Sequence, residues 1–94
     1  MLSQIPIDLS KVKKESIDRE ILRLGIIAEL DAINLYEQMA ELTDNKDIKK
    51  ILLDIAREEK THVGEFQTLL LRLDEEQVKE LEEGRKEVEE ELED

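Results

Sequence analysis

The sequence predicts an all-α protein, built from an antiparallel helical hairpin and a short C-terminal helix. Leu, Ile, Glu and Lys dominate its 94 residues, whereas only 2% of residues are aromatic and three are Gly, a composition that favours helices over strands. Apolar residues also recur every three or four positions along two stretches of similar length, as on one face of an amphipathic helix. A chain of this length forms one domain with a small core, so a partner subunit is expected.

The first segment, residues 1–15, contains Pro6 and no helical period, and is predicted to be an N-terminal arm. The hairpin is expected over residues 16–73. Its first helix is predicted to begin at Ser16, a residue type suited to an N-cap, and to end near Leu42.

Residues 43–47 read Thr-Asp-Asn-Lys-Asp, the strongest turn signal in the chain and a source of N-caps for the next helix. A second helix is then predicted from about Lys46 to Leu73. Each helix has about 27 residues and is roughly 40 Å long at 1.5 Å per residue. Two equal helices joined by a short turn form an antiparallel hairpin.

The last segment, residues 74–94, is predicted to be an acidic C-terminal helix, opened by Asp74 and Gln77 in the spacing of a capping box. It carries twelve acidic and three basic residues. Its apolar residues form a narrow stripe of coiled-coil type, which needs a neighbour: Val78, Leu81, Val88 and Leu92.

Charge and composition exclude several functions. The formal charge of −12 disfavours contact with nucleic acid or an anionic membrane and attracts cations. Without Cys the chain can form neither disulfides nor thiolate metal sites. No apolar run has the length of a signal peptide core or a membrane span, so a cytoplasmic, soluble protein is expected.

Ionisable residues interrupt both apolar stripes. Glu29 lies in the stripe of the first helix, together with Leu22, Ile26, Ile33, Tyr36 and Ala40. Glu59 and His62, the only His, lie in the stripe of the second helix, together with Leu52, Ile55, Phe66, Leu69 and Leu73. No Lys or Arg lies on either stripe. Burying a carboxylate costs several kcal/mol unless a proton, an ion pair or a metal compensates.

The spacing Glu59-x-x-His62 places both side chains on one helical face, where they can reach one metal ion. A di-iron carboxylate centre in a four-helix bundle uses a Glu from each of two helices and a Glu-x-x-His from each of the other two. Two copies of this hairpin supply that set, and their four carboxylates balance two ferrous ions. The sequence therefore predicts a symmetric dimer with a shared metal site, although manganese or zinc accepts the same ligands.

Two segments, Ala28-Glu-Leu-Asp-Ala-Ile-Asn-Leu-Tyr36 and Arg57-Glu-Glu-Lys-Thr-His62, resemble the encapsulated ferritins, half-length ferritin-like proteins housed in encapsulin shells. The resemblance covers roughly residues 20–73. It implies a ferritin-like four-helix bundle formed by two hairpins, and an iron-oxidising di-iron site with Glu29, Glu59 and His62 as ligands and Tyr36 beside them.

The resemblance further implies an annular decamer of such dimers inside an encapsulin nanocompartment, and it matches Asp31 to an acidic position near the metal access route. On this basis Glu59 is expected to bridge two irons, Glu29 and His62 to complete their ligand shells, and Tyr36 to orient a ligand. No encapsulin-targeting peptide is recognisable. The sequence could therefore be a domain of a shell fusion protein, or a relative that is targeted to the shell in another way.

Two other functions remain open at this point. The chain could be an acidic helical oligomerisation module that uses no metal. It could also be a rubrerythrin-like peroxidase, although the four-cysteine iron site of full rubrerythrins is impossible here because the chain has no Cys.

Overall fold

A computed structural model of the chain describes residues 13–93, and within them it contains three α-helices and no strand. A short 3-10 turn, Lys14–Ser16, precedes the helices α1 (Ile17–Leu42), α2 (Lys46–Leu73) and α3 (Glu75–Leu92). The predicted all-α class, with a hairpin and a C-terminal helix, is confirmed. The predicted N-terminal arm lies almost entirely outside the described residues.

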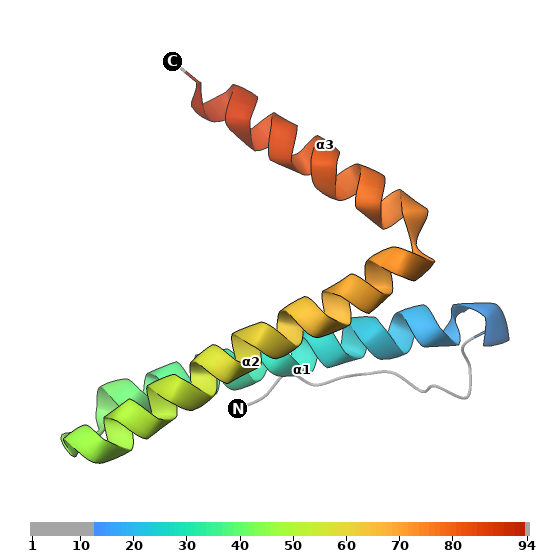
Figure 1. Cartoon of the computed structure of the whole chain (residues 1–94). Coiled ribbons are helices and arrows are strands. Elements are labelled where there is room, and N and C mark those ends of the chain that lie inside the picture. Colours follow the sequence, from blue (N-terminus) through green and yellow to red (C-terminus); the bar gives the residue numbers. More distant parts are fainter. Residues whose placement is uncertain (1–12, 94) are drawn as a thin grey trace.

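The helices α1 and α2 run antiparallel and side by side, whereas α3 turns sharply away at the end of α2 and projects from the hairpin (Figure 1). Within residues 13–93, hairpin contacts therefore dominate the packing, and most of α3 has no neighbour among them. None of the helices in the described part of the chain is long and apolar enough to cross a membrane.

Side-chain caps define where α2 and α3 begin. The Asn45 side chain accepts hydrogen bonds from the backbone N–H groups of Asp47 and Ile48, both at 3.0 Å. At the next junction Asp74 Oδ1 accepts from the backbone N–H of Gln77 at 3.0 Å. These bonds satisfy donors that the first helical turn leaves unpaired, which explains why both helices start at the predicted positions.

The start of α1 differs from the expectation. Ser16 precedes the helix, but its side chain makes no capping hydrogen bond and its backbone is itself helical, with φ −105° and ψ −8°. An N-cap needs an extended backbone to turn its side chain toward the first N–H groups. The preceding 3-10 turn prevents this, and the Ser16 hydroxyl instead accepts a hydrogen bond from Arg19 at 3.1 Å.

The core of a single chain is small. Its buried apolar residues are Leu22, Ile33, Ala40, Ala56 and Leu70. The α1 residues match the predicted stripe, but on α2 the buried line is shifted by one position, from Leu69 to Leu70. Leu69 and Leu73 keep 47% and 50% of their surface exposed, because α1 covers only one side of the predicted stripe.

Ion pairs connect elements outside the core. Lys60 Nζ lies 3.2 Å from Glu37 Oε2, linking α2 to α1. Arg23 Nη2 lies 2.9 Å from Asp74 Oδ2 and thereby ties the start of α3 to α1. Asp74 thus both caps α3 and fixes it to the hairpin, which determines where α3 leaves the molecule.

Candidate metal centre

The antiparallel packing of α1 against α2 brings the three predicted ligands together. Glu29 lies near the middle of α1, and Glu59 and His62 lie one turn apart near the middle of α2. His62 Nδ1 is 3.3 Å from Glu29 Oε2 and 3.4 Å from Glu59 Oε2. One ligand atom from each residue lies within 4.8 Å of the other two, the only such group of three within residues 13–93.

The two carboxylates are more enclosed than the imidazole. Their side chains are 18% and 19% exposed, whereas that of His62 is 44% exposed. The group is therefore walled by the hairpin on one side and open on the side where His62 lies. The described part of the chain places no Lys or Arg in an ion pair with either carboxylate, and the His62 ring lies within 3.4 Å of an oxygen of each.

The donor set suits a divalent transition metal. Carboxylate oxygen and imidazole nitrogen together accept iron, manganese or zinc, and all three side chains can turn toward one point between them. Three ligands leave positions for water, substrate or further protein ligands. One hairpin therefore offers half of the ligand set that a di-metal carboxylate bundle requires.

Tyr36 and Asp31 lie further along α1 and are both half-buried. Tyr36 is two turns beyond Glu29 on the same helical face. The expected roles of Tyr36 beside a bound ligand and of Asp31 on the access route remain predictions.

The sequence did not predict one contact beside the candidate centre. The ring of Phe66 packs against the α1 backbone at Gly25, where an added Cβ would lie 3.1 Å from two of its atoms. The available signal was a glycine inside a helix of strong helix formers, one turn before Glu29.

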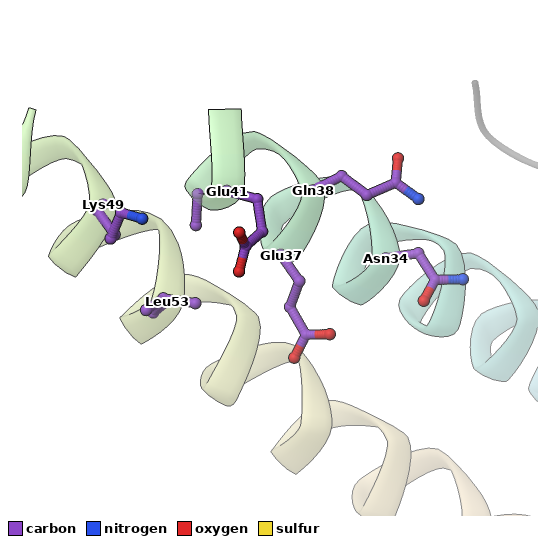
Figure 2. Close-up of a pocket in the computed structure, with 7 residues that line it drawn as sticks. Asn34, Glu37, Gln38, Glu41, Lys49 and Leu53 are labelled. Carbon is purple, nitrogen blue, oxygen red and sulfur yellow. The ribbon is translucent and has the colours of Figure 1, made fainter. Parts of the chain in front are cut away.

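The hollow that accompanies the hairpin turn is distinct from this centre. It measures about 460 Å³ and is lined by Asn34, Glu37, Gln38, Ala40, Glu41, Lys49 and Leu53. Glu37 and Glu41 extend from α1 toward α2, whereas Asn34 and Gln38 point away from it (Figure 2). Glu37 is already paired with Lys60, and among the described residues no group of three metal-ligating side chains converges in this hollow.

An apolar surface adjoins the exposed side of His62. Its α2 residues lie on the same helical face as His62, and each is about half exposed. Ile21 of α1 belongs to it because Ile21, Leu69 and Leu73 line one hollow. We call this surface the open face: Ile21, Ile48, Ile51, Leu69 and Leu73. Leu81 of α3 instead borders a hollow with Ile27 and Leu71, which helical periodicity places on the opposite side of the hairpin.

A hairpin with a Glu on one helix and a Glu-x-x-His on the other defines the class of ferritin-like helical proteins. Comparison with known proteins agrees. The profile of the rubrerythrin family matches residues 20–93. The crystal structure of an encapsulated ferritin domain from Pyrococcus furiosus superimposes with a TM-score of 0.81 at 57% identity, covering 96% of this chain and 92% of that chain.

Two curated relatives are similar in sequence. A ferritin-like–encapsulin shell fusion protein of Pyrococcus furiosus is 69% identical over 71 residues, which is 76% of this chain and 21% of the relative. An encapsulin nanocompartment cargo protein of Myxococcus xanthus is 46% identical over 71 residues, 72% of this chain and 55% of the relative. The chain thus spans about a fifth of the length of the Pyrococcus furiosus relative and about half that of the Myxococcus xanthus relative. It belongs to the encapsulated ferritin family.

Proposed function

We propose that this chain is a ferroxidase, which oxidises Fe(II) to Fe(III) at a site shared between two copies and supplies iron for storage inside an encapsulin shell. The observation that supports it most is the convergence of Glu29, Glu59 and His62 within 4.8 Å, with the opening on the side of the exposed imidazole. Three protein ligands on one chain bind a metal incompletely. A second copy facing this opening doubles the set.

The open face supports docking at this side of the hairpin. Its five apolar side chains are about half exposed in one chain, and covering each contributes roughly 1 kcal/mol. Exposed apolar side chains on the helix face that carries His62 favour a binding interface there. A dimer formed there is a four-helix bundle of two α1 and two α2 helices.

In this site the ferrous ions are the substrate. Held in pairs, they supply one electron each to O₂, which takes up two protons and is reduced to hydrogen peroxide. Glu29 and Glu59 supply negative charge that favours the ferric over the ferrous state, because hard carboxylate oxygens bind the more highly charged ion more strongly. His62 supplies the nitrogen ligand, and Tyr36 orients a ligand nearby.

Iron as the metal and the shell as the partner rest on the family. The relatives are named as ferritin-like, encapsulin-fused or encapsulin cargo proteins. Assembly of dimers into an annular decamer, and location inside the nanocompartment, are proposed on the same basis. A hairpin of this size has no cavity for mineral, so storage requires an enclosing shell.

Iron oxidation tests this function directly. Fe(II) is added anaerobically, O₂ is admitted, and ferric absorbance is followed for the wild type and for Glu29→Gln, Glu59→Gln and His62→Ala. We expect each variant to oxidise iron at least about tenfold more slowly, since losing even a group that supports a metal ligand costs that much. Tyr36→Phe is expected to slow oxidation and leave the amount of bound iron unchanged.

The matched control is Glu58→Gln, which removes an exposed carboxylate from the same helix and should leave the rate unchanged. If the three ligand variants oxidise iron at the wild-type rate, the proposed assignment of these residues as iron ligands is wrong. Faster oxidation by hydrogen peroxide than by O₂ would favour the peroxidase, and a dimer that binds no metal would favour the oligomerisation module.

A further inference from the structure

Gly25 occupies an unfavourable place for its residue type. It lies inside α1, and no glycine in the described part of the chain has a positive φ, so its backbone is one that other residues adopt. Glycine in the interior of a helix costs about 1 kcal/mol relative to alanine. A reason for glycine at this position must therefore come from packing.

The neighbour that requires a glycine is Phe66. A Cβ added to Gly25 would lie 3.1 Å from Cδ2 and Cε2 and 3.2 Å from Cδ1 of the Phe66 ring, closer than ordinary van der Waals contact. The other helical glycines, Gly64 and Gly84, have no atom within 4 Å of the corresponding position. The ring thus packs against the bare backbone of α1 at this one glycine.

This contact lies in the layer next to the metal centre. Gly25 is one turn before Glu29 on α1, and Phe66 is one turn after His62 on α2. Since the helices are antiparallel, these steps lead in the same direction along the hairpin. The distance between the helices at Gly25 therefore constrains the distance between Glu29 and His62, which is 3.3 Å.

We propose that Gly25 and Phe66 are positioning residues, which set the spacing of α1 and α2 so that Glu29 reaches the same metal ion as Glu59 and His62. This inference rests on the proposed metal site. A methyl group at Gly25 shifts the ring or the helix by a few tenths of an ångström. Ligating groups must be held within about 0.5 Å of their productive positions, so such a shift uses most of that margin and weakens metal binding while the hairpin stays folded.

The test uses cobalt(II) chloride as a spectroscopic probe, because its visible absorption reports the ligand geometry. We expect Gly25→Ala to bind Co(II) about tenfold more weakly, with a changed spectrum. Gly64→Ala makes the same change in open space on α2, and should bind with wild-type affinity and spectrum. Wild-type binding by Gly25→Ala would overturn the proposal.

A second pair of variants separates spacing from folding. Phe66→Leu removes the ring that Gly25 accommodates and should also weaken Co(II) binding. In Gly25→Ala/Phe66→Leu the new methyl group fills the vacated space, so affinity should return to within about threefold of the wild type, a coupling typical of residues in contact. A double variant that binds Co(II) no better than Phe66→Leu would overturn the proposal, and this comparison does not require Gly25→Ala to fold.

The outcome also distinguishes this inference from the function on which it rests. If wild-type protein binds no Co(II), the metal site fails and the positioning role falls with it. If the wild type binds Co(II) and Gly25→Ala binds it equally well, the metal site stands and only the positioning role is wrong.

Discussion

At the scale of single residues, the candidate metal centre is a group of two carboxylates that share one imidazole nitrogen. His62 Nδ1 lies almost equally close to two carboxylate oxygens, of Glu29 at 3.3 Å and of Glu59 at 3.4 Å. One ring N–H donates one good hydrogen bond, whereas both carboxylates are acceptors when ionised. A divalent cation between the three groups satisfies all of them at once.

Metal binding should therefore stabilise the fold through these residues. At a metal concentration one hundred times the dissociation constant, the expected gain is about 2.7 kcal/mol. Glu29→Gln keeps the shape and removes the charge. If it weakens binding tenfold, the gain falls by about 1.4 kcal/mol.

Thermal unfolding with and without Mn(II) measures this difference. Glu58→Gln is again the control, and it should retain the full metal-induced shift. An equal shift in Glu29→Gln and the wild type would show that Glu29 does not bind the metal.

Much of the centre was predictable because its residues break a pattern. Glu29, Glu59 and His62 are conspicuous as ionisable groups on apolar stripes, and the structure brings all three together. The Phe66 contact was not predictable, because which side chain meets Gly25 depends on the register and rotation of two helices. Those quantities are set by packing along the whole hairpin.

At the scale of the elements, α3 is held by its own charges rather than by a core. Arg85 pairs with Glu82 one turn earlier, at 2.5 Å, and with Glu89 one turn later, at 2.6 Å. The hydrogen bond from Arg85 holds the pKa of Glu82 below its ordinary value. A carboxyl with a lowered pKa stabilises the helix above its unfolded pKa, and this contribution is lost as the pH falls through the folded pKa.

Titration by NMR tests this pair. The Glu82 carboxyl should titrate at a lower pH in the wild type than in Arg85→Gln, where the hydrogen bond is removed. The same variant should show faster amide exchange in α3 near neutral pH, and the two proteins should converge in acid. Equal pKa values for Glu82 in both would show that the pair is absent in solution.

Helix positions follow from local chemistry to different degrees. The starts of α2 and α3 were predictable because Asn45 and Asp74 cap them through hydrogen bonds to nearby backbone N–H groups. Ser16 is the N-cap residue of α1, as predicted, but its side chain makes no capping hydrogen bond, since Ser16 ends a 3-10 turn and its backbone is helical instead of extended. The direction of α3 depends on the long-range pair of Arg23 with Asp74, which no local pattern reveals.

At the scale of the whole molecule, a single chain leaves much of its apolar surface uncovered. Leu69 and Leu73 belong to the predicted stripe and yet are about half exposed. The sequence predicted which residues face a core, but it did not distinguish a core within one chain from one shared between chains. Periodicity is the same in both cases.

Leu69→Glu tests whether the open face joins two copies. A charge on this face should prevent dimerisation and abolish iron oxidation, although all the metal ligands remain. Leu42→Glu is the control, because Leu42 at the hairpin turn is already 85% exposed. Sedimentation velocity measures the mass, and a Leu69→Glu protein that remains dimeric would place the interface elsewhere.

Native mass spectrometry with anaerobic Fe(II) tests the shared centre most directly. The account predicts metal-dependent pairing: without iron, a population rich in single chains, and with iron, assemblies that carry two metal ions for every two chains. Glu59→Gln should lose both the metal and the pairing. One tightly bound ion on each single chain, with the mass of the assembly unchanged by iron, would contradict a site shared between two copies.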